Sequence, residues 1–332
     1  MAEVKRRGEA AAGTVAGPGG GAGTGGTAAP GGTPTAGAAG AATRYRLLAL
    51  DVDGTLLTSR GTITRRTKRA IRRAVAAGIH VTLATGRVFP SARLIARALG
   101  LASPLVVSDG AFVVDPGGSA GRPSVLHAHP MDRDLAREVA AFLADAGLPV
   151  VLHFTDHLAG SYRPSWRQVM RSLGRGGLWH YLAMRPHVRY VASADLPRYI
   201  DAAAGAPAKI SAIGRKERLQ PVQRALLARL GGHVHVTHSA ARSFDVLPAG
   251  VSKASGLARL AALLGVRPEE VVAVGDNDND REMLRFAGLG VAMANAPEDV
   301  RRCARLVTRS NDEDGVAHLI EEVLLAGGTV PP

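Results

Sequence analysis

Cysteine is almost absent from this chain of 332 residues, and long apolar runs do not occur in it. The single cysteine, Cys303, excludes a disulfide framework within one chain, which fits a reducing compartment. Because no run of about 18 apolar residues occurs, we predict no membrane-spanning helix and no membrane partner. Residues 1–43 also lack the apolar segment of a signal peptide. Together these absences predict a cytoplasmic protein.

The first 43 residues contain no aromatic residue and almost no large aliphatic residue. Such a segment cannot bury enough apolar surface to offset the entropy lost on ordering, so we predict a disordered Gly/Ala/Thr/Pro-rich tail over 1–43. Its glycines are not followed by the Lys-Ser or Lys-Thr pair of a phosphate-binding loop, so they predict no nucleotide site.

Positive charge is in excess, with a formal net charge of +13. Residues 151–230 hold thirteen Lys or Arg and four Asp or Glu, a net of +9, so most of the excess lies in one central region. This excess suits a nucleic acid, an acidic surface or a phosphorylated substrate, and equally a solvated basic face. We do not expect a nucleic-acid partner from charge alone.

Strand and helix patterns alternate from residue 44 onward. "YRLLALD" and "IHVTLATGR" have the pattern of buried strands, and the segment after each has apolar residues at helical spacing. Thr64 is a candidate N-cap for the first helix, while Gly78 and Gly100 are candidate stops for the two helices. "PLVVSDGAFVVD" predicts two short strands around Asp109 and Gly110. This alternation predicts a parallel sheet with helices on both faces.

The pattern changes in the middle of the chain and then resumes. Residues 130–243 still alternate between helix and strand, but their strands are more polar and the region is basic. We predict a smaller α/β cap domain at 130–243, inserted into a core formed by 44–129 and 244–332. The apolar run "VVAVG" in the second core segment is typical of a central parallel strand.

Polar side chains stand at the ends of three predicted strands of the core. Asp51, Thr85 and Asp276 follow "LLAL", "VTLA" and "VVAVG". Ligands of parallel α/β sheets bind beyond the carboxyl ends of the strands, so we expect these side chains to converge on one crevice.

This crevice has the residues for magnesium-dependent phosphate chemistry. Asp51 and Asp276 would repel each other without a cation between them, and carboxylate oxygens are ligands that Mg²⁺ prefers. A carboxylate beside Mg²⁺ and a phosphate can act as a nucleophile, which makes Asp51 the candidate. Asp53 can protonate the leaving oxygen and later deprotonate water, and Gly54 allows the turn that directs it into the site.

The chain resembles the haloacid dehalogenase superfamily, and within it the Cof-type phosphatases. The resemblance rests on "DVDGTLL", "TLATGR", Lys253 of "GVSKASGL", "GDNDNDREML" and "VTRSNDEDGVA", in this order and with a cap-sized gap. It covers about residues 44–325 and implies a Rossmann-like core with helices on both faces and an inserted cap.

The resemblance also implies a role for each matching residue. Asp51 is then the nucleophile and a Mg²⁺ ligand, and Asp53 is the general acid/base with its backbone carbonyl on the metal. Thr85 and Gly86 hold the transferring phosphoryl group, and Lys253 neutralises charge on the phosphate and Asp51. The fourth motif supplies three further residues: Asp276 as a metal ligand, Asn279 as a phosphate contact, and Asp280 to orient Lys253 or the metal's waters.

One departure from the family and one feature of the predicted cap concern the substrate. The family often has Asn-Gly where this chain has Asp109-Gly110. The extra carboxylate either changes the choice of substrate or caps a turn, and we favour the turn. In the cap, Arg163, Arg167, Arg171 and Arg175 recur at a spacing of four. We favour a solvated face over a substrate clamp for these arginines.

The sequence therefore predicts a Mg²⁺-dependent phosphatase of small phosphorylated metabolites, sugar phosphates first. Alternatives are a phosphotransferase or phosphomutase with the same chemistry, a phosphatase of proteins or lipids, and a non-catalytic protein that binds phosphate or nucleic acid. The oligomeric state is not predicted.

Overall fold

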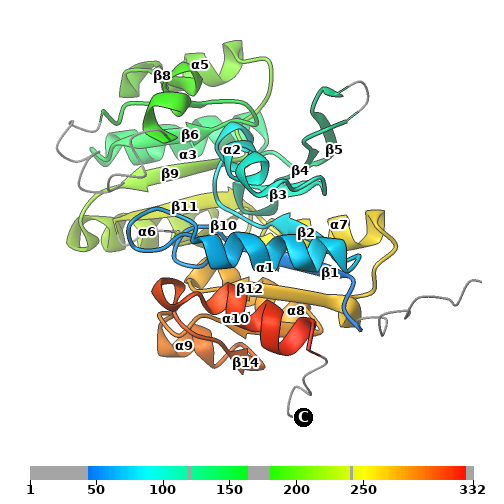
Figure 1. Ribbon diagram of the computed structural model, residues 1–332. Helices are drawn as coiled ribbons and strands as arrows, with labels where there is room; N and C mark the ends of the chain where they lie inside the picture. The colour runs from blue at the N-terminus through cyan, green and yellow to red at the C-terminus, as the bar shows by residue number, and fades with distance from the viewer. Residues whose placement is uncertain (1–43, 119–120, 164–179, 240–241, 327–332) are drawn as a thin grey trace, which may run out of the picture. The chain divides into compact units, whose positions relative to one another are not determined.

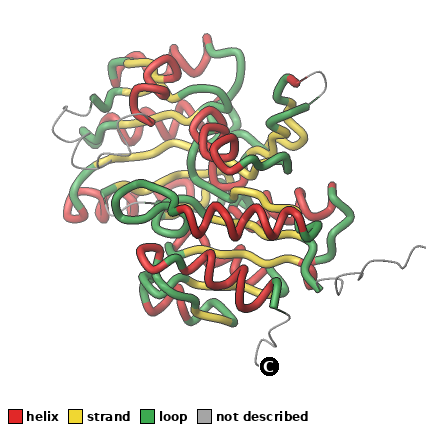
Figure 2. Tube along the Cα trace, in the orientation of Figure 1, coloured by secondary structure: helices red, strands yellow, loops and turns green. Residues whose placement is uncertain are grey.

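The computed structural model describes residues 44–118, 121–163, 180–239 and 242–326. The predicted tail at 1–43 and three of the four spaced arginines, Arg167, Arg171 and Arg175, lie outside them. Strands and helices alternate through the described part (Figures 1 and 2). The α-helices with both ends among the described residues are α1 (Arg65–Ala76), α2 (Phe89–Leu99), α3 (Arg133–Asp145), α5 (Leu196–Ala202), α6 (Lys216–Leu230), α7 (Lys253–Leu263), α8 (Arg281–Phe286), α9 (Glu298–Arg301) and α10 (Gly315–Leu319).

The described strands form three sheets. The strands are β1 (Leu47–Leu50), β2 (His80–Leu83), β3 (Leu105–Val107), β4 (Phe112–Asp115), β5 (Ser124–Ala128), β6 (Val150–His153), β7 (Leu158–Gly160), β8 (Val188–Tyr190), β9 (Lys209–Ile213), β10 (Val234–Thr237), β11 (Ser243–Pro248), β12 (Val271–Gly275), β13 (Leu289–Ala292) and β14 (Leu306–Val307). One sheet has the order β14-β13-β12-β1-β2 and is parallel throughout, with β12 at its centre.

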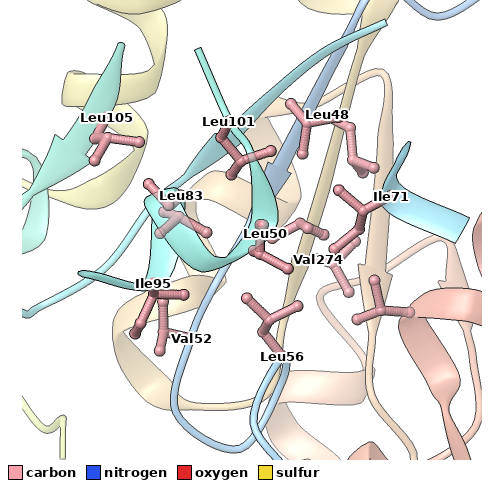
Figure 3. Close-up of a cluster of buried hydrophobic side chains, with 14 of the residues drawn as sticks. Leu48, Leu50, Val52, Leu56, Ile71, Leu83, Ile95, Leu101, Leu105 and Val274 are labelled. Carbon is pink, nitrogen blue, oxygen red and sulfur yellow. The ribbon is translucent and has the colours of Figure 1, made fainter. Parts of the chain in front are cut away.

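Side chains along a strand alternate between the two faces of a sheet. Both faces of this parallel sheet carry apolar side chains, and helices cover both. Leu48 and Leu50 of β1 belong to the apolar cluster that contains Ile71 of α1, and Figure 3 shows these side chains together. Leu47 and Ala49 belong to the cluster on the other face, with residues of α7 and α8. In Figure 1, α1 and α10 lie on the near face of the sheet. The predicted fold class is confirmed.

The predicted N-cap of α1 and the predicted end of α2 agree with the structure, whereas α1 ends at Ala76, shortly before the predicted Gly78. The Thr64 side chain accepts a hydrogen bond from the Thr67 backbone N–H and caps α1. The chain turns away after this helix at Gly78, whose φ is +85°, and α2 ends at Gly100, whose φ is +74°. The two helices, α1 and α2, follow β1 and β2, the strands whose carboxyl ends carry candidate site residues.

A short antiparallel sheet, β3-β4-β5, follows the parallel one along the chain. A single parallel bridge between Ala84 and Val106 links β3 to the segment after β2. The turn between β3 and β4 is a 3₁₀ helix over Ser108–Gly110, in which Asp109 has a φ of +53°. Asp109 therefore lies in a turn, but its side chain does not cap that turn and instead accepts from Lys209 and Asn279.

The third sheet is six-stranded, with the order β10-β11-β9-β6-β7-β8, and comes from the region predicted to be the cap. Its apolar side chains pack with α3, α5 and α6 in a core of their own. The predicted boundary between residues 243 and 244 falls within β11, which pairs with both β9 and β10. We infer that the cap extends to Pro248. None of the described helices has the length and hydropathy needed to cross a membrane.

Candidate active site

The carboxyl ends of three neighbouring strands bring Asp51, Thr85 and Asp276 to one edge of the parallel sheet. Their strands, β1, β2 and β12, are adjacent in the sheet, with β1 between the other two. Asp51 and Thr85 are buried, and Asp276 is partly buried. The convergence that the sequence predicted is therefore present.

Lys253 reaches this edge from the first residue of α7. Its Nζ atom lies 2.5 Å from Oδ1 of Asp51 and 2.7 Å from Oδ1 of Asp280, and the residue is 1% exposed. Burial lowers the pKa of Lys253, but the charges of Asp280 and Asp51 raise it by more, so the ammonium group stays charged. The Ser252 side chain caps α7 by accepting a hydrogen bond from the Ser255 N–H. This cap fixes the start of the helix and therefore the position of Lys253, its first residue.

Asp280 is held by hydrogen bonds on both of its oxygens. Oδ2 accepts from the backbone N–H groups of Asp276 and Asn277, at 2.8 and 2.9 Å, and Oδ1 accepts from Lys253. Few lone pairs remain for a metal ion. The geometry favours the predicted role of orienting Lys253.

Asp51, Asp276 and Asp280 form a cluster that suits a divalent cation. One carboxylate oxygen from each lies within 4.8 Å of the others. Burial raises the pKa of Asp51 well above its usual value; Lys253 opposes this shift, and the carboxylates of Asp280 and Asp276 add to it. Burial, followed by repulsion from Asp280, raises the pKa of Asp276 to about 6. Lys253 contacts two of the three carboxylates, Asp51 and Asp280, and leaves an excess of negative charge. The hard oxygen donors and this excess charge both fit Mg²⁺.

Asp53 pairs with Arg87. The guanidinium binds in a bidentate manner, with Nε 2.7 Å from Oδ2 and Nη2 2.6 Å from Oδ1. Burial raises the pKa of Asp53, but the hydrogen bond and charge of Arg87 lower it by more. Water still reaches 57% of the Asp53 side chain, so the burial effect is modest and the Arg87 pair decides the direction.

His180, from the predicted cap, contacts the Arg87 guanidinium nitrogen that does not bind Asp53. Its Nε2 atom lies 3.0 Å from Arg87 Nη1 and 3.0 Å from Ser91 Oγ. Burial and the neighbouring Arg87 lower the pKa of His180 to about 4, so the ring is neutral at pH 7. Sequence analysis did not identify Arg87 as a site residue, although it closes the motif "TLATGR".

The residues predicted to hold phosphate stand beside one another. Thr85 Oγ1 accepts from the backbone N–H of Arg87 at 3.2 Å. Thr85, Gly86 and Asn279 line the same cavity as Asp51. Asn279 Nδ2, however, donates to Oδ1 of Asp109 at 2.8 Å, so it reaches a carboxylate of the chain.

The cavity above these residues has a volume of about 610 Å³ and is lined by both the core and the predicted cap. The cap sheet contributes alternate residues of its strands. In β9, Lys209, Ser211 and Ile213 line the cavity, whereas Ile210 and Ala212 belong to the cap core. This alternation is visible in the sequence "KISAI", but it does not show which face meets the active site.

A family model described as haloacid dehalogenase-like hydrolase matches residues 48–320, so the chain belongs to that family. Named relatives agree. The chain is 32% identical over 289 residues to the 5-amino-6-(5-phospho-D-ribitylamino)uracil phosphatase YitU of Bacillus subtilis (strain 168), covering 84% of this chain and 98% of that protein. It is 30% identical over 298 residues to phosphatase YwpJ of the same organism, covering 84% and 100%.

A solved structure of a haloacid dehalogenase-like hydrolase from B. subtilis superimposes with a TM-score of 0.74 at 27% identity, covering 84% of this chain and 100% of that one. The resemblance to Cof-type phosphatases is confirmed. The chain is a phosphatase of this family.

Proposed function

We propose that the chain is a Mg²⁺-dependent phosphatase that hydrolyses small phosphorylated metabolites through a phosphoryl intermediate on Asp51. The observation that carries this proposal is the contact of Lys253 Nζ with Asp51 Oδ1, at 2.5 Å, and Asp51 lines a cavity of about 610 Å³. A buried ammonium group beside a carboxylate favours the ionised, nucleophilic form of that carboxylate. The same cation is positioned to offset charge that develops on the phosphoryl oxygens.

In the first step an Asp51 oxygen forms a bond to phosphorus, and the bond between phosphorus and the ester oxygen breaks. Asp53 gives its proton to that oxygen, so the alcohol leaves neutral. In the second step Asp53 takes a proton from water as the water oxygen attacks phosphorus. The bond to Asp51 breaks, inorganic phosphate is released and the Asp51 carboxylate is restored.

Mg²⁺ would be held by the carboxylates of Asp51 and Asp276 and by the backbone carbonyl of Asp53, and it supplies positive charge that draws the phosphate toward Asp51. Thr85 and the Gly86 amide would orient the phosphoryl group, with Asn279 beside them. Arg87 now occupies both oxygens of Asp53. For Asp53 to act as an acid, Arg87 must release at least one of those oxygens, and the substrate phosphate is an alternative partner for its guanidinium.

Sugar phosphates are the first candidate substrates, because the cap wall of the cavity offers both donors and acceptors to hydroxyl groups. A second candidate is a phosphorylated polyol that carries a planar ring. Tyr162, Tyr181 and Tyr190 line the cavity, and their rings suit a planar partner. The relative YitU is named for such a substrate. A cytoplasmic location is part of the same proposal and fits the single cysteine.

The test is release of free phosphate from a panel of phosphorylated metabolites, with Mg²⁺ and with EDTA. Wild type is compared with Asp51→Asn and with a matched control, Asp145→Asn, which changes an exposed carboxylate at the end of α3. We expect release that requires both Mg²⁺ and Asp51 and that Asp145→Asn retains.

Isotopically labelled phosphate separates hydrolysis from transfer. Label found in free phosphate supports the phosphatase, whereas label found in a second sugar hydroxyl would favour the phosphotransferase or phosphomutase. Absence of release from every panel member by a folded protein would refute the proposal.

A further inference from the structure

A buried ion pair joins the turn after β3 to the cap sheet. Lys209 Nζ, on β9, lies 2.5 Å from Asp109 Oδ2 and 3.1 Å from Asp245 Oδ2, on β11. All three residues are about 1% exposed. Burying two carboxylates around a single lysine is costly unless other groups compensate them, so this arrangement needs an explanation.

Hydroxyl groups supply part of that compensation. Asp245 Oδ1 accepts from Ser211 Oγ, and Asp245 Oδ2 accepts from Ser239 Oγ at 2.5 Å. Ser211 Oγ also lies 2.8 Å from Nε2 of His153. Burial raises the pKa of Asp245, but Lys209 lowers it by more, to about 2, so this carboxylate is ionised. Burial and the charge of Lys209 lower the pKa of His153 to about 3, so this ring is neutral.

The cluster therefore carries a net charge of about −1, with two carboxylates, one ammonium group and a neutral imidazole. One polar atom in it is unused: the buried Nδ1 of His153 has no hydrogen-bond partner among the described residues. The cavity of about 610 Å³ that Asp51 lines is also lined by four residues of the cluster: Lys209, Ser211, Ser239 and Asp245. The cluster thus offers donors and acceptors to a group inside the cavity.

The cluster also adjoins the predicted phosphate site. A Cβ atom at Gly86 would lie 2.9 Å from Asp109 Oδ2 and 3.2 Å from Lys209 Nζ. The other oxygen of Asp109 accepts from Asn279, a predicted phosphate contact. When the phosphate of a substrate lies beside Asp51 and Gly86, its leaving group therefore lies close to this cluster. Arg189 also lines the cavity, but it is exposed and donates to the backbone carbonyls of Pro186 and Val188.

We propose that Asp109, Lys209 and Asp245, with Ser211, Ser239 and His153, form the specificity-determining site for the leaving group and select an uncharged polyhydroxylated group over one that carries a second negative charge. The inference rests on the proposed phosphatase function. Hydroxyl groups can donate to Asp245 and accept from Lys209, whereas a second anion would be repelled by the net negative charge of the cluster.

The experiment compares three compounds with one skeleton: glucose 6-phosphate, 6-phosphogluconate and glucosamine 6-phosphate. Their leaving groups are neutral, anionic and cationic. Each is measured as a competitive inhibitor of p-nitrophenyl phosphate hydrolysis, and kcat/KM is measured wherever it is itself hydrolysed. In wild type we expect the neutral and cationic compounds to bind at least about fivefold tighter than the anionic one.

Two variants then remove negative charge while keeping shape: Asp109→Asn and Asp245→Asn. Each should reduce the preference for glucose 6-phosphate over 6-phosphogluconate by about fivefold, while Asp145→Asn leaves the ratio unchanged. Because each comparison is a ratio within one variant, a general loss of activity cancels. A purely structural role of the ion pair would change kcat or stability and leave the ratio intact.

The inference is overturned if wild type binds 6-phosphogluconate as tightly as glucose 6-phosphate, or if both variants keep the wild-type ratio. Its failure can be told from failure of the proposed function. Hydrolysis of p-nitrophenyl phosphate that depends on Asp51 tests the function alone. If turnover fails, dissociation constants of the three compounds, measured by calorimetry on Asp51→Asn, still give the ratio that decides the inference.

Discussion

Gly54 and Asp276 lie closer together than any side chain at position 54 would allow. A Cβ atom on Gly54 would lie 2.2 Å from Oδ2 of Asp276, and the φ of Gly54 is +82°. The Asp276 carboxylate is fixed from the other side by Thr55, whose hydroxyl donates to Oδ1 at 2.7 Å. The turn after β1 therefore fixes the position of Asp276, a proposed metal ligand that follows a different strand, β12.

Gly54→Ala should weaken Mg²⁺ binding more than it weakens the fold. The left-handed backbone costs about 1 kcal/mol with alanine, and the clash adds a displacement of Asp276. Gly78→Ala is a matched control, because its φ is +85° and nothing lies within 4 Å of the new Cβ. We expect both variants to lose similar thermal stability without metal, and only Gly54→Ala to need at least about tenfold more Mg²⁺ for half-maximal activity. Equal Mg²⁺ requirements would contradict this account.

Lys253→Met should abolish most activity and destabilise the chain. Two buried carboxylates, Asp51 and Asp280, lose their common cation, a change that typically costs about 3–5 kcal/mol. Losing a cation that stabilises the transition state should reduce kcat by about 100-fold or more. Chemical denaturation and single-turnover rates measure the two effects.

Lys216→Met is the control for Lys253→Met, since Lys216 is exposed at the start of α6. It should change neither quantity appreciably. Added Mg²⁺ should restore part of the stability lost by Lys253→Met, because the metal would replace a missing positive charge. Full activity of Lys253→Met would show that this lysine has no role in phosphoryl transfer.

Mg²⁺ affinity should fall as the pH is lowered through about 6. Without metal, burial and Asp280 raise the pKa of Asp276 to about 6, so below that pH a proton occupies the carboxylate and must leave before the metal binds. Calorimetry in two buffers of different ionisation enthalpy should detect proton release at pH 6 and less of it at pH 8. Asp276→Asn should lower this release by the part that Asp276 contributes, while Asp51, whose pKa is also raised, can still release a proton. A release unchanged in Asp276→Asn would contradict the assignment.

The positions of Asp51, Thr85 and Asp276 were predictable because a buried parallel strand has a simple pattern and its carboxyl end has a known place in the sheet. The six-stranded sheet was harder to predict. β11 is not predicted because "SFDVLP" carries Asp245 and a proline, although Phe244 and Val246 alternate into the cap core.

The contacts of Asp109 could not be predicted in the same way. The pair Asp-Gly indicated a turn, and the turn is present. Its buried partner Lys209 is 100 residues away on another sheet, and a lone lysine in a strand has no local signal of a charged partner. Only the packing of the cap sheet against the turn brings the two together.

Arg87 should control the pH dependence of leaving-group protonation. Its bidentate hydrogen bonds to Asp53 lower the pKa of that carboxylate, so Arg87→Gln should raise it toward its usual value. An acid must be protonated to act, so a higher pKa extends activity to higher pH. For an alkyl phosphate, whose leaving oxygen needs a proton, we expect the alkaline limb of the kcat profile to move to higher pH.

The same variant supplies its own control through the choice of substrate. The p-nitrophenolate of p-nitrophenyl phosphate leaves without protonation, so its profile should keep the wild-type alkaline limb in Arg87→Gln. Arg87→Lys keeps a positive charge but cannot bind both Asp53 oxygens in the same fork, and it should give an intermediate shift with the alkyl phosphate. If the alkyl and aryl profiles shift together, Arg87 acts on substrate binding, and Asp53 is not the acid whose pKa it sets.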